Sequence, residues 1–149
     1  MAIRTAILFS LVLVLVGCAP EPRTFNLAIK NESASVVTLA LTKDGPPVEP
    51  AWASPEDLAA KRAVLTPQTR EGYASLPPGK TAAINGITGL FSGNTNAVLR
   101  VYRGDYVDHK DALLAIQPGP ARSDITLTPG DNRFIIRDHG DSLSVEPSK

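Results

Sequence analysis

Apolar and polar residues alternate along two segments near the start of the chain, "TFNLAIKN" and "VVTLALT". A period of two is typical of a β-strand that buries one face and exposes the other. The polar residues "NESAS" between the two segments favour a turn, so we expect a hairpin of two neighbouring strands. The predicted inward residues are Phe25, Leu27 and Ile29 in the first strand and Val37, Leu39 and Leu41 in the second.

The segment "SPEDLAAKRAVL" carries the signals of a helix start. Ser54 can cap the helix, and Pro55 suits its first position because proline lacks the amide hydrogen that is unpaired there anyway. Glu56 and Asp57 fall in the first turn, where the helix dipole favours negative charge. Pro67 would end the helix. We therefore predict one short helix after the second strand, crossing one edge of a sheet.

Short apolar segments separated by turn residues continue to the end of the chain. They are "TAAINGITGLF", "AVLRVYRG", "ALLAI", "DITLT", "RFIIR" and "SLSVE". The pattern Leu-x-Pro-Gly occurs at 76–79 and 127–130 and predicts type II turns between antiparallel strands, because glycine adopts a positive φ easily. About seven to nine strands at this spacing predict an all-β fold, a single antiparallel β-sandwich of immunoglobulin- or transthyretin-like style over residues 24–149.

Composition excludes several functions. The 149 residues carry 15 basic and 15 acidic side chains and no formal net charge, so nucleic acid is not an expected partner. Gly79-Lys80-Thr81 matches the end of a phosphate-binding loop, but Ala74 stands where that loop needs glycine, and we expect no nucleotide. The chain has one cysteine, Cys18, and therefore no internal disulfide.

The first residues differ from the rest of the chain. Arg4 gives a positive start, and residues 6–16 are apolar apart from Ser10. This run is shorter than the roughly 18 to 20 residues that cross a bilayer as a helix. Its proportions predict a signal peptide over residues 1–17.

Residues 15–18, Leu-Val-Gly-Cys, resemble the lipobox of bacterial lipoproteins. The resemblance implies that the Cys18 sulfur receives a diacylglyceryl group, that cleavage falls after Gly17, and that the new amino terminus is acylated. A thiolate is a suitable nucleophile for such a transfer. Ordinary secretion is the alternative, with Gly17 and Ala19 as the small residues of a conventional cleavage site. Pro20 would then follow the scissile bond directly, which conventional signal peptidases tolerate poorly.

The residue after the lipobox cysteine bears on location in the cell envelope. By the same resemblance, an aspartate there implies retention in the inner membrane of enteric bacteria, whereas Ala19 favours the outer membrane if the host has one. Residues 18–23 would form a lipidated tether, because their two prolines resist helix and sheet pairing. We expect no cofactor besides the covalent diacylglycerol and N-acyl chain on Cys18.

Both histidines lie between aspartates, in "DHKD" and "DHGD". Imidazole and carboxylate groups are ligands for zinc and other divalent ions, so these two loops could share one metal if the fold brings them together. The candidate ligands are Asp108, His109, Asp138 and His139. Two polar turns are the alternative, since aspartate is a common turn residue. The chain has neither a GxSxG nor an HExxH motif, and we do not expect an enzyme.

Trp52 is the chain's single tryptophan and precedes the predicted helix. An exposed ring at this position could stack on a sugar or on a partner protein. A tryptophan beside a helix cap could instead cover the open end of a sandwich.

Together these features predict a lipid-anchored protein of the cell envelope with a non-catalytic role in binding or assembly. Its partner would be another envelope protein, and loops 43–53 and 66–80 and the sheet edges are candidate contact surfaces. The order of leader, two strands, helical insert, Leu-x-Pro-Gly strand and terminal strands is similar in layout to the small outer-membrane lipoproteins of type VI secretion systems. That resemblance implies a structural component of an envelope secretion machine. A divalent-metal-binding periplasmic protein is the remaining alternative.

Overall fold

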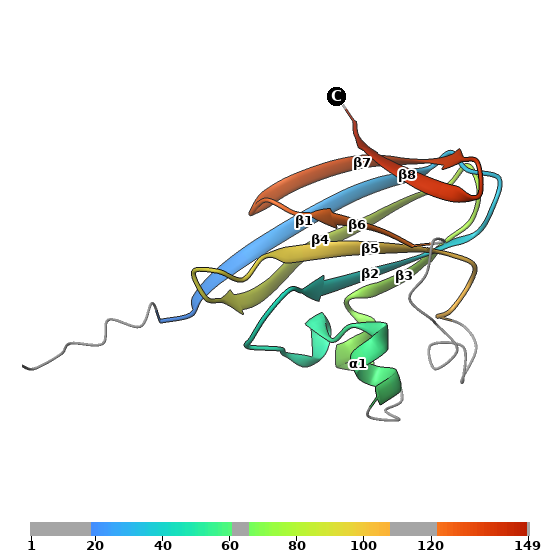
Figure 1. The fold of residues 1–149 in the computed structure, drawn as a ribbon. Coiled ribbons are helices and arrows are strands. Elements are labelled where there is room, and N and C mark those ends of the chain that lie inside the picture. The colour runs from blue at the N-terminus through green and yellow to red at the C-terminus, as the bar shows by residue number, and fades with distance from the viewer. Residues whose placement is uncertain (1–18, 61–65, 108–121, 149) are drawn as a thin grey trace, which may run out of the picture.

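Two four-stranded sheets pack face to face in the computed structural model, which describes residues 19–60, 66–107 and 122–148 (Figure 1). Sheet A contains, in spatial order, β4 (Thr81–Phe91), β1 (Glu21–Asn31), β7 (Gly130–His139) and β8 (Ser142–Pro147). Sheet B contains β3 (Tyr73–Leu76), β2 (Val37–Lys43), β5 (Ala97–Arg103) and β6 (Arg122–Thr126). All pairings are antiparallel except that of β1 with β7. The predicted all-β sandwich is confirmed.

The inward faces of the strands form one core between the sheets. The predicted inward residues of β1 and β2 are all buried there, at no more than 1% exposure. Other core members come from every remaining strand except β6, and from two connections. They are Leu76, Ile87, Phe91, Ala97, Leu99, Val101, Phe134, Ile136 and Leu143, with Trp52 and Leu127 from connections. The period of two in the sequence thus identified the buried face correctly.

The predicted hairpin between the first two strands is wrong. β1 pairs with β4 and β7, whereas β2 pairs with β3 and β5. The chain crosses from sheet A to sheet B after Asn31, whose buried side-chain amide donates to the carbonyl oxygens of Ser35 and Leu76 at 2.8 Å each. This crossing sets the two apolar faces against each other across the core, which buries more apolar surface than placing them side by side would.

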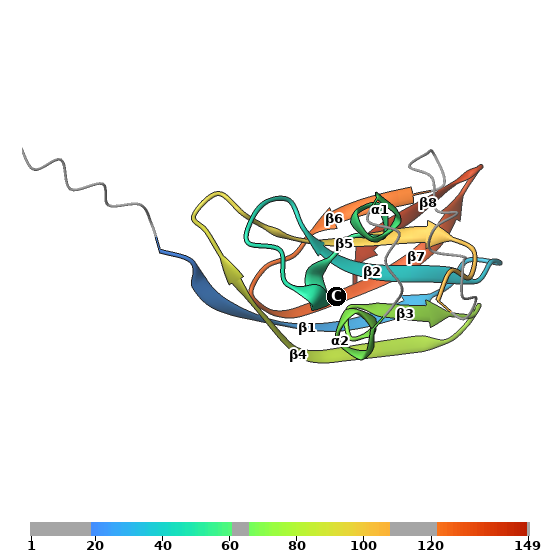
Figure 2. The same ribbon diagram turned by 90° about the horizontal axis from the view of Figure 1, so that it is seen from below.

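The connection from β2 to β3 covers the outer face of sheet B (Figure 2). It contains the 3₁₀ helix η1 (Pro50–Trp52), α1 (Pro55–Ala60) and α2 (Pro67–Arg70). The prediction of one helix ended by Pro67 is therefore wrong, because this proline occupies the first turn of a second helix that Thr66 caps. The connection and the sheet enclose a second apolar cluster between them, made of Ala40, Ala53, Leu58, Tyr73, Tyr102 and Val107. The helix expected at a sheet edge therefore lies on a sheet face, and the outward side chains of β2 are buried as well as its inward ones.

Two Pro-Gly turns carry the chain between the sheets. Gly79 and Gly130 have φ angles of +72° and +93°, so the expected positive φ is confirmed at both positions. One turn leads from β3 to β4 and the other from β6 to β7, in each case from sheet B to sheet A. The sequence had suggested that these turns connect antiparallel partners. The strands that they connect lie in different sheets and are not hydrogen-bonded to each other.

β1 begins at Glu21, earlier than the boundary at residue 24 that the prolines suggested. Glu21 and Pro22 pair with Phe91 and Leu90 of β4, so part of the expected tether is strand. Within the described part of the chain, no helix has the length and apolar character needed to span a membrane.

Candidate functional site

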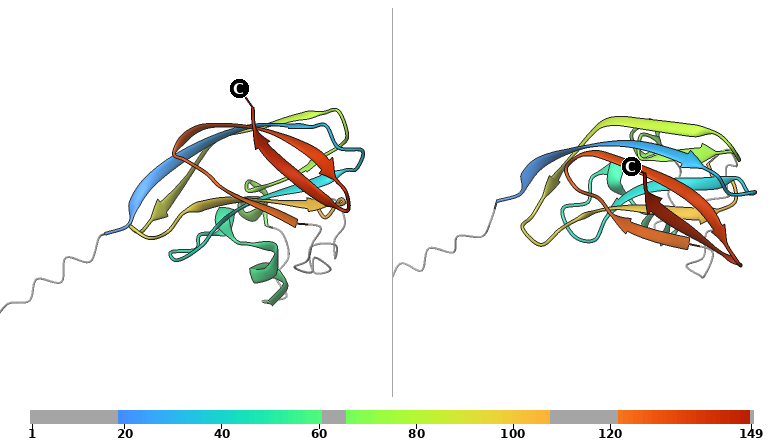
Figure 3. Two further views of the ribbon diagram at one scale, coloured as in Figure 1. Left: turned by 45° about the horizontal axis from the view of Figure 1, so that its top comes forward. Right: turned by 90° about the horizontal axis from the view of Figure 1, so that it is seen from above.

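The chain enters the sandwich at one end, which we call the entry end and define as residues 21–23, 43–49 and 89–96. In two further views the start of β1 lies beside the β4–β5 connection and the connection that leaves β2 (Figure 3). Hydrogen bonds join the three segments. The Arg23 guanidinium donates to the Thr95 carbonyl oxygen at 3.3 Å, and the Thr95 hydroxyl donates to the Pro46 carbonyl oxygen at 3.0 Å.

Lys43 is the central polar residue of the entry end, and its side chain is fully buried. Its ammonium group donates to the carbonyl oxygens of Pro47 at 2.9 Å and Leu90 at 2.7 Å, and to the Glu49 carboxylate. These three acceptors match the three protons of an ammonium group. Lys43 was not predicted as a site residue, but the sequence carries a signal for it: Lys43 continues the inward line of Leu39 and Leu41.

Glu49 completes this arrangement by binding both a cation and a backbone amide. Its Oε1 accepts a hydrogen bond from the Leu90 amide at 2.6 Å. Burial acts to raise the pKa of Glu49, but the Leu90 amide and the Lys43 ammonium outweigh it and hold this pKa below its ordinary value. Both backbone groups of Leu90 are thus bonded to side chains and point away from β1. Its partner Pro22 therefore occupies a non-hydrogen-bonded position of the ladder. The missing amide hydrogen of proline costs no hydrogen bond there.

Trp52 is completely buried, so the hypothesis of an exposed stacking ring is wrong. Its ring packs against Phe25 and Phe91 with centroid separations of 5.5 and 5.2 Å, both edge to face. Its Nε1 donates to the Thr88 carbonyl oxygen at 3.2 Å, which satisfies the indole. The Lys43 ammonium lies 4.4 Å from the centre of the Phe91 ring. Trp52 therefore fills the core beside the entry end.

Two large apolar side chains are exposed in the described part of the chain, and both belong to the entry end. They are Val48, at 50% exposure, and Leu90, at 44%. The Lys43–Glu49 pair connects the two segments that carry them, because it binds the Leu90 backbone and the residues on either side of Val48. Val48 also lines the rim of a groove that reaches Glu56 and Arg100. The entry end therefore combines a fixed backbone with exposed apolar side chains.

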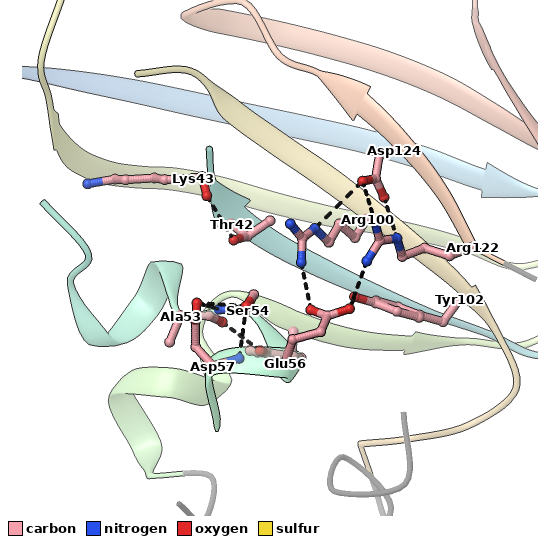
Figure 4. Close-up of polar contacts among 11 residues, drawn as sticks. Thr42, Lys43, Ala53, Ser54, Glu56, Asp57, Arg100, Tyr102, Arg122 and Asp124 are labelled. Atoms are coloured by element: carbon pink, nitrogen blue, oxygen red, sulfur yellow. Dashed lines mark hydrogen bonds and ion pairs between the residues drawn. The ribbon is translucent and has the colours of Figure 1, made fainter. Parts of the chain in front are cut away.

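A second polar cluster lies on the outer face of sheet B, under α1 (Figure 4). Glu56 accepts hydrogen bonds from Arg100 at 2.6 Å, Arg122 at 2.8 Å and the Tyr102 hydroxyl at 2.9 Å. Asp124 forms a second ion pair with Arg122 at 3.0 Å. Two guanidinium groups thus face two carboxylates, which leaves little charge for an anionic ligand.

The ionisation of Glu56 supports a structural role for this cluster. Burial acts to raise the pKa of Glu56, but its hydrogen bonds and the charges of Arg100 and Arg122 prevail and lower it. Burial and the nearby Glu56 carboxylate raise the pKa of Tyr102. A carboxylate stabilised in its charged form is a weak proton acceptor. An open groove of about 650 Å³ lies beside Glu56, and this carboxylate is not suited to act there as a general acid or base.

Comparisons with known proteins identify distant structural neighbours and no family. No family model matches the chain, and no curated protein matches its sequence. The chain is similar to the type VI secretion lipoprotein TssJ1 from Pseudomonas aeruginosa, with 12% identity, a TM-score of 0.37, and coverage of 87% of this chain and 98% of that chain. It is also similar to Lip from Serratia marcescens, a membrane-bound component of the type VI secretion system. Here the identity is 11%, the TM-score 0.37, and the coverage 87% of this chain and 99% of that chain. Likeness of this degree carries no argument about function.

The predicted lipidation and metal residues lie partly outside the described residues. Cys18, Asp108 and His109 lie outside the described residues, and so does the expected strand "ALLAI". Asp138 is described, and it forms an ion pair with Arg103 at 2.9 Å and accepts the Ala34 amide at 2.7 Å. His139 follows it at the exposed end of β7. Among the described residues, no group of three or more histidine, cysteine or acidic side chains is placed to hold a metal.

Proposed function

We propose that the protein is a lipid-anchored component of the cell envelope whose sandwich has a non-catalytic role in binding or assembly. The observation that carries the proposal is the position of the lipobox relative to the fold. Ala19 and Pro20 alone separate Cys18 from the first strand, so the candidate lipidation site adjoins the folded domain. Such a domain would be held directly at the membrane surface.

The anchor would be the covalent lipid on Cys18. A single acyl chain binds a membrane only reversibly, at about 0.8 kcal/mol per buried methylene, whereas two or three chains bind it stably. The thioether on the sulfur and the acylated amino group of Cys18 would together supply them. Ala19 after the cysteine supports the outer membrane as the location, if the host has one.

The acidic groups of the two polar clusters support a non-catalytic role. Glu49 is paired with Lys43, and Glu56 with Arg100 and Arg122, so both are held in the charged form by cationic partners. Their surroundings lower the pKa of each, which is the opposite of what a general acid needs at neutral pH. These carboxylates stabilise the sandwich and its helical connection.

The lipid anchor is tested by metabolic labelling of the full chain with palmitate. Cys18→Ala should abolish the label, because the acceptor sulfur is lost. Ser10→Ala is the matched control, since it changes the leader but keeps the lipobox, and its labelling should equal that of the wild type. Undiminished labelling of the Cys18→Ala protein would overturn the proposal.

A structural component of an envelope secretion machine is the second candidate. The order of leader, strands, helical connection and terminal strands supports it, since the described connection does form helices on one sheet face. Sequencing the flanking genes and recovering cross-linked partners from the envelope test it together. Flanking genes without secretion functions and partners from outside any secretion machine would contradict it.

A further inference from the structure

We propose that the entry end of the sandwich lies against the lipid bilayer, with Val48 and Leu90 entering its interface. The proposal rests on the proposed lipidation of Cys18. It goes beyond that function because it assigns a second, non-covalent membrane contact and an orientation to the domain. The ligand is the bilayer surface itself.

The reach of the chain supplies the first argument. Three Cα steps lead from Cys18 to Glu21, and each spans at most about 3.6 Å, so Glu21 lies within about 11 Å of the lipidated residue. The polar headgroup region on each side of a bilayer is roughly 5 to 8 Å thick. The start of β1 is therefore at, or just above, the level of the headgroups.

The start of β1 is firmly attached to the rest of the fold, which supplies the second argument. Glu21 pairs with Phe91, and Arg23 both bonds to Thr95 and lies 5.5 Å from the centre of the Phe91 ring. Lengthening the link to the membrane would require breaking these contacts. Pro20, whose φ is fixed by its ring, further limits the orientations of the link. The sandwich therefore has few ways to turn its entry end from the membrane.

The exposed apolar side chains supply the third argument. Val48 and Leu90 are the large apolar residues left exposed in the described ranges, and both are on the end where the chain would meet lipid. Pro22 and Pro46 are exposed beside them. Apolar surface that is unfavourable in water becomes favourable at the boundary with the acyl chains.

The charges of the entry end decide which lipids it prefers. Lys43 is neutralised by Glu49 and is buried, and the half-buried Arg23 is offset by the exposed Glu21 and Asp44. This surface has no excess of positive charge to attract anionic headgroups. Contact should therefore form on uncharged phosphatidylcholine, and anionic lipid should not strengthen it.

Site-specific fluorescence on the full-length lipidated protein tests the proposal. Val48→Cys and Leu90→Cys introduce exposed thiols that can be labelled selectively, because the Cys18 sulfur would be held in the thioether. A polarity-sensitive fluorophore at either position should shift to the blue in phosphatidylcholine vesicles, and acyl-chain spin labels should quench it by at least about twofold. Ala34→Cys is the matched control, since Ala34 is exposed in the connection at the opposite end of β1. Its fluorescence should not change.

The outcomes separate the two proposals. Vesicle-bound protein whose labels at 48 and 90 remain as polar and unquenched as the label at 34 would overturn the membrane contact while leaving the lipid anchor intact. Equal quenching at all three positions would also overturn it, because the domain would then lie on its side. Failure of the labelled protein to float with vesicles would overturn the anchor and this contact with it.

Discussion

At the scale of single residues, buried and half-buried charges are the features that connect distant segments of this protein. Lys43 joins the end of β2 to Pro47, Glu49 and Leu90, and Glu56 joins α1 to β5 and β6. The alternation in the sequence places Lys43 on the inward face, but nothing local identifies its acceptors. Two of these acceptors are backbone carbonyls, which every residue has, so only the folded arrangement reveals them.

Glu56 gives a pH-dependent contribution whose sign follows from its pKa. Because this pKa is below its ordinary value of 4.5 in the folded protein, the stabilisation is complete above that value and is lost as the pH falls through the folded pKa. Glu56→Gln should lower the unfolding free energy at pH 7 by about 1 to 3 kcal/mol. The difference from wild type should shrink as the pH falls below this ordinary value.

Urea unfolding at a series of pH values measures this effect. Glu71→Gln is the matched control, because it removes the same charge from an exposed side chain at the end of α2. Its effect should stay within about 0.5 kcal/mol. A Glu56→Gln difference that is constant from pH 3 to pH 7 would contradict the assignment.

At the scale of elements, periodicity predicted the strands but not their partners. β1 pairs with β7 in a register that sets Phe25 opposite Gly130, and no local pattern encodes a contact over that separation. The outward residues of β2 have the alternating pattern of a solvent-facing surface, yet Thr38 and Ala40 are buried under the helical connection. An alternating strand shows which residues share a face, and tertiary packing determines what covers that face.

The start of α1 was predicted from local chemistry and is confirmed. The Ser54 hydroxyl accepts the Asp57 amide at 3.0 Å and donates to the Asp57 carboxylate at 2.7 Å (Figure 4). Ser54→Ala should therefore lower the unfolding free energy by about 1 kcal/mol, with an unchanged denaturant slope. Ser144→Ala is the control, because its hydroxyl makes only an exposed 3.3 Å contact with Glu146. Equal losses in the two variants would rule out the capping role.

At the scale of the whole molecule, the two ends of the sandwich differ in chemistry. The entry end has apolar side chains around the half-buried Lys43–Glu49 ion pair, whereas the opposite end has polar connections, including Ser33 to Ser35 and the Asp138–Arg103 ion pair. Of the predicted contact loops, 43–53 begins at the entry end, and 66–80 ends at the opposite end, where the Gly79 amide bonds to Asn31. The sequence located these loops but could not assign them to opposite ends, since that requires the sheet order.

Zinc titration of the whole protein tests the remaining alternative. Both Asp138 carboxylate oxygens already have partners, Arg103 and the Ala34 amide, so a metal would have to displace them. We therefore expect no heat of binding and no rise in melting temperature at tens of micromolar zinc. A saturable signal that His109→Ala and His139→Ala each remove would establish a shared metal site instead.

The length of β1 has a consequence for any partner of this protein. β1 contains 11 residues, and at about 3.3 Å per residue it extends roughly 36 Å from the entry end. With that end on the bilayer and the strand upright, the β1–β2 and β3–β4 connections would stand at a set height above the lipid surface. The sandwich would then act as a rigid spacer, and a partner that binds these connections would have to approach from the aqueous side rather than along the membrane.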